Sequence, residues 1–144
     1  MMFNMSVHDS YPREETALVD RVLGEGNDAA APLHEVRPLS CFARTETGIG
    51  SWRRCGSLVG GQGCELQQLW LEPSFRRRGI ATRLVRVFEA RAGEHGCSTF
   101  YLETFNFQTP RLYETLDYTV AYEHKVYPHG IVKYIMVKHT QNPA

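Results

Sequence analysis

The segment that most constrains the fold is a strand followed closely by an amphipathic helix that begins at a glycine. CELQQLWL at 64–71 alternates as a strand does, and Pro73 ends it. From Gly79 onward, apolar residues recur at helical spacing. Three consecutive arginines, at 76–78, occupy the loop between the two elements. The chain must therefore bring a strand end, a basic loop and a helix start close together.

The basic loop predicts a bound anion. A helix N-terminus already carries partial positive charge, so adding cations there is unfavourable without a negative partner. Backbone N–H groups at the helix start also favour an anion, and Gly79, which lacks a Cβ, lets a ligand approach closely. The loop is neither a P-loop nor a GxGxxG turn. Composition alone favours a solvated charge run, which stays the alternative.

The remaining pattern predicts one mixed α/β domain over residues 1–144. Expected strands lie at 3–8, 36–44, 51–59, 64–71, 98–105, 118–123 and 131–138, and expected helices at 13–25, 79–93 and 109–116. The order is β-α-β-β-β-α-β-α-β-β.

Composition narrows the function classes. Sixteen basic and sixteen acidic residues cancel, which argues against nucleic-acid and membrane partners and makes any anion site local. The four cysteines form no CxxC pair and have no histidine at metal spacing, so we expect no metal site. Without an 18-residue apolar stretch or a leader-like N-terminus, the sequence predicts a soluble, cytoplasmic protein.

Two segments of this chain, RRRGIA at 76–81 and NFQTPRLYETLDY at 106–118, resemble two motifs of the GNAT superfamily of N-acetyltransferases. RRRGIA at 76–81 fits the family pattern Q/R-x-x-G-x-G/A, which holds the pyrophosphate of coenzyme A. NFQTPRLYETLDY at 106–118 is similar to the family segment N-x-x-A-x-x-x-Y-E-x-x-G-F. Both occur in the family's order, and the resemblance covers roughly residues 30–139, looking most like small bacterial members.

The resemblance implies a mostly antiparallel central sheet flanked by helices, with two strands splayed around the cofactor. It implies acetyl-CoA as the co-substrate, an amine acceptor, direct transfer and no metal. The residues expected to bind the cofactor are Leu69, Leu71, Arg76, Arg77, Arg78, Gly79, Ile80, Ala81, Thr82 and Asn106. Asn106 would bond the pantetheine arm, with a role as a helix-capping turn residue as the alternative.

The resemblance also assigns two catalytic roles. Tyr113 aligns with the tyrosine that protonates the coenzyme A sulfur; a core aromatic is the alternative. Glu65 is the candidate base, since strand alternation puts it on the same face as Leu69 and Leu71. Equally, Glu65 could be a surface carboxylate, with a relay of water molecules removing the proton from the amine instead.

Three further positions carry expectations. Asp117 stands where the family has glycine, so a left-handed turn with some strain is expected there. His129 lies in the loop that joins the last two strands and could reach the acceptor; an exposed loop histidine is the simpler interpretation. Trp70 faces away from Glu65 and is expected in the core.

Two rival functions stay open at this point. One is a non-catalytic acyl-CoA-binding module on the same fold, against which the presence of both Tyr113 and Asn106 argues. The other is a nucleic-acid-binding domain that uses Arg53 and Arg54 with the arginines at 76–78, against which the zero net charge argues. The acceptor itself stays open among polyamine, aminoglycoside, amino acid and protein amines, because the loops at 26–35 and 124–130 carry no motif. A homodimer also stays open.

Overall fold

A computed structural model describes residues 2–30, 36–45, 48–58 and 63–140 and divides into two compact units, Met1–His34 and Glu35–Ala144. The N-terminal unit contains one helix, α1 (Arg13–Ala30), with Glu14 and Glu15 in its first turn, where the helix dipole favours acidic side chains. The helix extends five residues beyond the predicted end at 25, through Gly26. No helix in the described ranges is long and apolar enough to cross a membrane.

The predicted strand over 3–8 is wrong. Residues 2–12 form neither helix nor strand, and Phe3, Met5 and Val7 are almost fully exposed. Their alternation supplies strand propensity, whereas a strand also requires backbone hydrogen bonds to a neighbouring strand.

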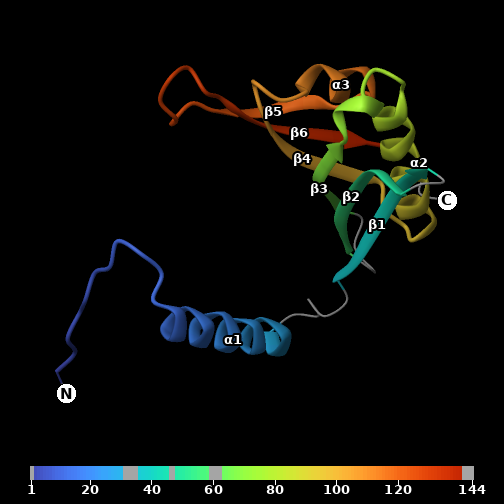
Figure 1. Cartoon of the computed structure of the whole chain (residues 1–144). Helices are drawn as coiled ribbons and strands as arrows, with labels where there is room; N and C mark the ends of the chain where they lie inside the picture. Colours follow the sequence, from blue (N-terminus) through green and yellow to red (C-terminus); the bar gives the residue numbers. More distant parts are fainter. Residues whose placement is uncertain (1, 31–35, 46–47, 59–62, 141–144) are drawn as a thin grey trace. The chain divides into compact units, whose positions relative to one another are not determined.

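The C-terminal unit is a six-stranded sheet in the order β1-β2-β3-β4-β6-β5 (Figure 1). Its elements are β1 (Val36–Thr45), β2 (Gly48–Leu58), β3 (Gly63–Leu71), α2 (Ile80–Glu94), β4 (Thr99–Phe105), α3 (Pro110–Thr115), β5 (Thr119–His124) and β6 (Lys133–His139), with a 3-10 turn at Pro73–Phe75 between β3 and α2. Only β3 and β4 pair in parallel among these strands. The predicted mixed, mostly antiparallel fold and the element order from the first helix onward are confirmed.

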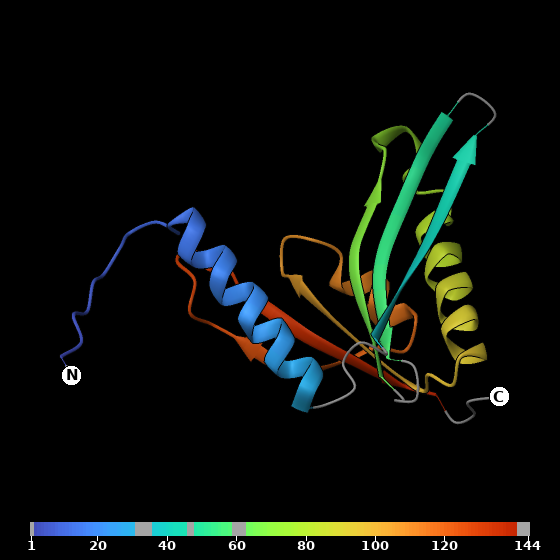
Figure 2. The ribbon, with the colours of Figure 1, turned by 90° about the horizontal axis from the view of Figure 1, so that it is seen from below.

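One face of the sheet carries the core. The helical spacing places Val85, Phe88 and Ala92 of α2 against it, and each is fully buried. The same cluster includes Tyr113 of α3 and Leu116, which caps the end of that helix, together with Cys64, Leu66, Cys97, Phe100, Leu102, Tyr118 and Met136. Burying a side chain the size of Phe88 stabilises a fold by about 1.5–3 kcal/mol. Helix α2 runs alongside β1 (Figure 2) and contributes these buried residues to the core.

A β-bulge interrupts β3. Arg53 of β2 lies opposite Leu69, whereas Arg54 lies opposite Gln67, so Gln68 is an extra residue on β3. Because one extra residue reverses the alternation, side chains on the two sides of a bulge change faces.

The neighbouring strands β3 and β4 then separate. Their pairing runs from Gly63–Thr99 to Leu66–Leu102 and stops there, although β3 continues to Leu71 and β4 to Phe105. Beyond Leu66 the two strands diverge, which opens the gap in which the candidate site lies.

Candidate active site

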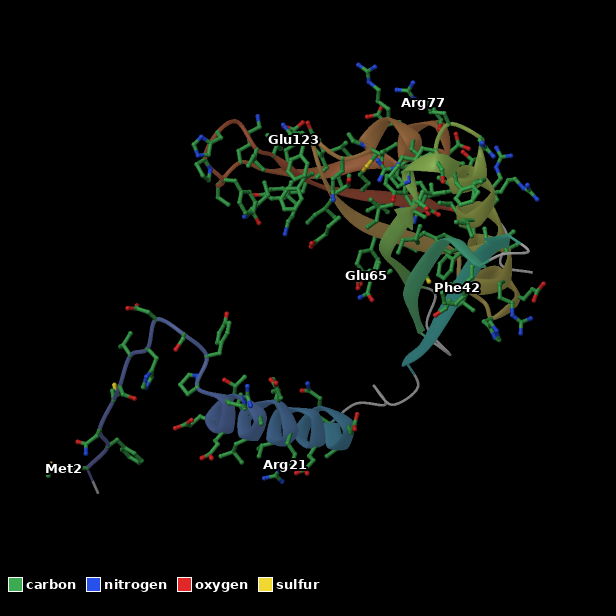
Figure 3. The ribbon with its side chains drawn as sticks, in the orientation of Figure 1. Met2, Arg21, Phe42, Glu65, Arg77 and Glu123 are labelled. Atoms are coloured by element: carbon green, nitrogen blue, oxygen red, sulfur yellow. The ribbon has the colours of Figure 1, made fainter. Side chains whose placement is uncertain are left out.

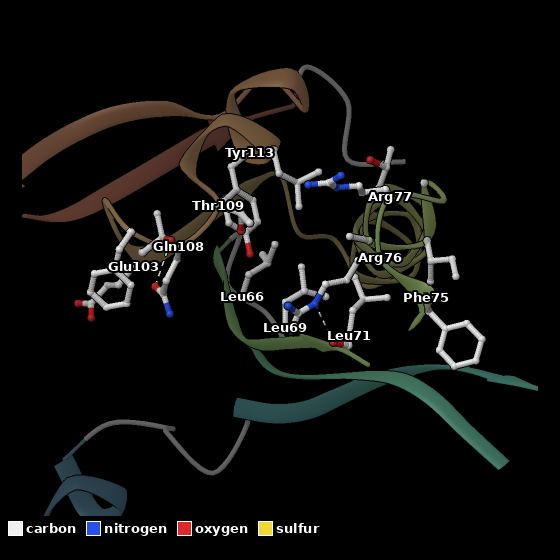
Figure 4. A pocket seen from close by; sticks show the side chains of 17 residues that line it. Leu66, Leu69, Leu71, Phe75, Arg76, Arg77, Glu103, Gln108, Thr109 and Tyr113 are labelled. Atoms are coloured by element: carbon white, nitrogen blue, oxygen red, sulfur yellow. Dashed lines mark hydrogen bonds between the residues drawn. The ribbon is translucent and has the colours of Figure 1, made fainter. Parts of the chain in front are cut away.

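The gap between β3 and β4 opens into a cavity of about 710 Å³. Its lining comes from β3 and its loop (Leu66, Leu69, Leu71, Phe75, Arg76, Arg77), from the start of α2 (Gly79, Ile80, Ala81, Thr82), and from β4 through α3 (Glu103, Thr104, Phe107, Gln108, Thr109, Leu112, Tyr113). Figure 4 shows the labelled side chains of this lining pointing toward a common space. Apolar walls with a few convergent polar groups are typical of a small-molecule site.

The start of α2 forms the cationic end of this cavity. Gly79 is the N-cap in a left-handed conformation, with φ 74° and ψ 9°, and no side chain caps the helix. A Cβ added to Gly79 would meet no atom within 4 Å, so its backbone faces open space. The first N–H groups of a helix have no intrahelical acceptor, and Ile80, Ala81 and Thr82 line the cavity. With no acidic residue in the first turn, this end is suited to an anion.

The three arginines separate into different positions. Arg76 and Arg77 line the cavity, whereas the Arg78 guanidinium lies over the Phe75 ring at 5.9 Å from its centroid. The Arg76 side chain donates from Nε to the carbonyl oxygen of Leu71 at 3.2 Å, which ties the loop to the strand end. Arg78, which was expected to bind the cofactor together with Arg76 and Arg77, therefore does not line the cavity.

Tyr113 reaches the cavity from α3, which starts at Pro110, a residue suited to the first helical position. It is buried, and in Figure 4 its ring lies between Glu103 on one side and Arg77 on the other. The helix ends at Leu116, followed by Asp117 in the expected left-handed conformation with φ 72°. The predicted strained turn is therefore present.

Glu65 is not where the alternation predicted it. The extra residue at Gln68 places Leu69 and Leu71 on the same side as Leu66, so Glu65 lies on the opposite face and does not line the cavity. Its carboxylate accepts hydrogen bonds from Gln67 Nε2 at 3.2 Å and from the Tyr101 hydroxyl at 3.4 Å. Burial raises the pKa of Tyr101, and the nearby Glu65 charge adds to that rise. In Figure 3, Glu65 points away from the side of the unit that carries Arg77.

Asn106 also lies outside the cavity lining. Its Nδ2 donates to the Gly130 carbonyl at 2.9 Å, and its Oδ1 accepts from the Val132 amide at 3.2 Å. The side chain predicted to hold pantetheine instead joins the turn after β4 to the β5–β6 connection. His129 of that connection does not line the cavity either. The side chains of Trp70, Arg53 and Arg54 lie outside what the structure describes.

Several residues that line the cavity were not predicted from the sequence, Glu103 above all. Glu103 is a charged residue within the otherwise largely apolar strand FYLETF, and this charge could have marked it as a candidate site residue. Its half-exposed carboxylate pairs with Lys133 at 3.4 Å. Thr104 and Gln108 line the cavity too, and Gln108 Oε1 accepts from the Phe105 amide at 2.8 Å, which fixes the turn.

The cavity is therefore polarised. Arg76, Arg77 and the positive end of α2 lie at one end, and Glu103 lies at the other, with Tyr113 between them (Figure 4). In the described ranges no three His, Cys, Asp or Glu side chains gather into a group that could hold a metal ion. The arrangement can hold an anionic ligand at the helix start and a cationic one at the opposite end.

Comparisons with known proteins agree with this geometry. The model of the Acetyltransferase (GNAT) family matches residues 34–118. A blasticidin-S acetyltransferase from Streptomyces morookaense is 33% identical over 133 residues, which cover 90% of this chain and 97% of that protein. An acetyltransferase structure from Bacillus cereus superposes with a TM-score of 0.76 at 20% identity, covering 93% of this chain and 97% of the other. The structure of an aminoglycoside 6'-N-acetyltransferase complexed with coenzyme A gives a TM-score of 0.65 at 19% identity, covering 85% and 87%. The chain therefore belongs to the GNAT family, the family of acetyl-CoA-dependent N-acetyltransferases.

Proposed function

We propose that the protein transfers the acetyl group of acetyl-CoA directly to a primary amine. The observation that carries the proposal is that the helix start at Gly79, Tyr113 and Glu103 all line the same cavity. A diphosphate is the anion that suits the N-terminus of α2 with Arg77 beside it. The pantetheine arm would then run along the free edge of β3, past Leu69, toward Tyr113.

Each group has a definite task in this reaction. The ammonium first loses one proton to solvent, and the neutral amine attacks the thioester carbonyl carbon; the C–S bond breaks, and Tyr113 gives its phenolic proton to the departing thiolate. The second proton, which the nitrogen loses as the acetamide forms, returns Tyr113 to its neutral form. A backbone N–H on the β3 edge would stabilise the developing oxyanion. The Leu71 carbonyl already accepts a hydrogen bond from Arg76 Nε and thereby helps to shape the loop. The backbone of Leu69 is therefore the better candidate for contact with the pantetheine arm. The net products are the acetamide, coenzyme A and one proton.

The acceptor we put forward first is blasticidin S, on the strength of the relative that carries that name. The test incubates the purified protein with acetyl-CoA and blasticidin S, measures release of free thiol, and identifies the product by a mass increase of one acetyl group. Spermidine, an aminoglycoside, an amino acid and a lysine peptide form the comparison panel.

The outcomes separate the competing functions. Thiol release that depends on an amine supports the proposal, and the preferred amine names the acceptor class. Binding of acetyl-CoA without thiol release in the presence of any amine would support the non-catalytic acyl-CoA-binding module instead. A protein that does not bind acetyl-CoA at all would overturn the assignment of the α2 start as the diphosphate site.

A further inference from the structure

We propose that Glu103 and Phe107 form the acceptor subsite, and that it selects amines attached to a flat, unsaturated ring. The proposal rests on the proposed function, because it names the class of amine that the acetyl group would reach. Glu103 lines the cavity at the end opposite to Arg76 and Arg77 (Figure 4), and Phe107 lines the same cavity. Phe107 is linked to Glu103 through Phe105, on which it stacks, and through Lys133, which lies over the Phe105 ring and pairs with Glu103.

Phe107 is an exposed ring in a binding cavity. Its exposed fraction is 66%, although it lines the cavity. One face of the ring stacks on Phe105, with 5.2 Å between centroids and 7° between planes. Because the ring is exposed and lines the cavity, we infer that its opposite face can receive a third flat ring and extend the stack. Offset stacked rings attract one another beyond what the buried area alone provides.

The wall behind Phe107 is held in place on several sides. Tyr127 meets Phe105 edge to face at 5.5 Å, and Lys133 Nζ lies 5.4 Å from the Phe105 centroid and 5.8 Å from that of Tyr127. Asn106, between the two phenylalanines, is bonded to the β5–β6 connection through both ends of its amide. A ring fixed before binding costs little entropy when a ligand stacks on it.

Glu103 supplies the charge that an amine requires. By alternation it lies on the face of β4 opposite to Leu102 and Thr104, which are buried on the helix-covered face. It nevertheless borders the cavity, because β3 has already diverged from β4. Lys133 pairs with one of its oxygens, and a carboxylate has further acceptor capacity for an ammonium. A cation at Glu103 and a ring on Phe107 would together orient the acceptor.

The test measures affinities of two matched amines for the full chain saturated with coenzyme A, by calorimetry, so that turnover is not needed. The amines are 2-phenylethylamine and 2-cyclohexylethylamine, which share the chain length and the ammonium but differ in the flatness of the ring. An ordinary apolar surface would hold the larger cyclohexyl group at least as tightly. A stacking site instead favours the phenyl compound, by about three- to tenfold for one ring–ring contact.

Variants then identify the ring that is responsible. Phe107→Leu should abolish the preference, Phe107→Tyr should retain it, and Phe42→Leu should leave it unchanged, since Phe42 is a partly exposed phenylalanine of β1 that does not line this cavity. Glu103→Gln should weaken the binding of both amines by the same factor, because both carry the same ammonium group. This result would distinguish the contribution of the Glu103 charge from that of the Phe107 ring. Equal affinity of the two amines, no measurable binding of either, or a preference that persists in Phe107→Leu would overturn the proposal.

Thiol release measured in parallel keeps the two proposals apart. Amine-dependent release together with equal affinities means that the acetyl transfer stands and the ring-selective subsite is wrong. A phenyl preference that depends on Phe107, without release from any amine, means that the subsite stands and the acetyl transfer is wrong. A rise in the acetyl-CoA dissociation constant of Phe107→Leu, with the amine preference intact, would place the ring in the cofactor arm of the cavity and overturn its role in acceptor selection.

Discussion

The backbone N–H of Tyr118 donates to the carbonyl oxygen of Tyr113 at 2.9 Å, and the two rings meet edge to face at 5.8 Å. With the Asp117 amide bonded to the Glu114 carbonyl at 3.1 Å, this completes a Schellman motif at the end of α3. The hydrophobic contact typical of that motif is made here by the proposed general acid itself. The helix end and the position of Tyr113 in the cavity therefore depend on one another.

Asp117→Gly is expected to stabilise the protein. A left-handed conformation costs an L-residue about 1–2 kcal/mol, whereas glycine adopts it freely and loses somewhat more entropy on folding. We expect a net gain of about 0.5–1 kcal/mol in the free energy of unfolding, measured by urea denaturation. Asp9→Gly, in the N-terminal segment, makes the same side-chain change outside any turn motif and should have no such effect. A loss of stability in Asp117→Gly would show that the aspartate side chain itself holds the turn.

Gly79→Asp and Gly79→Asn test the anion site as an isosteric pair. Both side chains tolerate the left-handed conformation at this position better than other residues do, so they differ mainly in charge. The aspartate should weaken acetyl-CoA binding at least about tenfold relative to the asparagine, which corresponds to losing one charge-assisted contact. Calorimetry with acetyl-CoA measures the difference. Equal dissociation constants would exclude the helix start as the diphosphate site.

Tyr113→Phe should lower turnover without weakening the binding of acetyl-CoA. In the proposed reaction the hydroxyl acts only as the thiolate leaves, and losing a positioned general acid typically costs about 10²–10⁴ in rate. The Michaelis constant for acetyl-CoA should stay nearly constant, as expected for a contact made mainly in the transition state. Tyr122→Phe, an exposed tyrosine that does not line the cavity, is the matched control. A raised constant for acetyl-CoA with normal turnover would limit Tyr113 to holding the cofactor.

Glu103→Gln and Glu65→Gln should affect the acceptor differently. Only Glu103 borders the cavity, so its neutralisation should raise the Michaelis constant for the amine, while Glu65→Gln leaves both that constant and the pH–rate profile unchanged. Steady-state kinetics with the amine varied at saturating acetyl-CoA distinguishes the two variants. A shift of the profile toward alkaline pH in Glu65→Gln would restore Glu65 as the base.

Tyr118→Phe should cost stability rather than activity. The Tyr118 hydroxyl donates to Glu89 Oε2 at 2.8 Å, and Lys138 pairs with Glu89 Oε1 at 3.0 Å, in a largely buried group that joins α2 to the sheet. Removing a hydrogen bond to a charged group costs about 1.5–3 kcal/mol, which urea denaturation would register. Turnover per folded molecule should change little. Unchanged stability would mean that water replaces the hydroxyl at Glu89.

Much of this fold follows from local signals in the sequence. The periodicity of α2 predicted its buried face, because a helix fixes which residues share a side whatever its surroundings. Gly79 was expected at the helix start, where it is the N-cap of α2. The left-handed turn at Asp117 was expected because the family has glycine at that position, and Asp117 adopts it with φ 72°. The resemblance of the segments at 76–81 and 106–118 to the family motifs then predicted the helix start and Tyr113 as parts of one site.

Other features were decided only by contacts distant in sequence. Phe3, Met5 and Val7 alternate like a strand, yet alternation cannot supply the partner strand that pairing requires. The bulge at Gln68 depends on how β3 registers against β2, and that single extra residue moved Glu65 to the face opposite Leu69. Glu103 gained access to the cavity because β3 and β4 diverge after Leu66 and Leu102, a separation that arises between two strands and is encoded by neither alone.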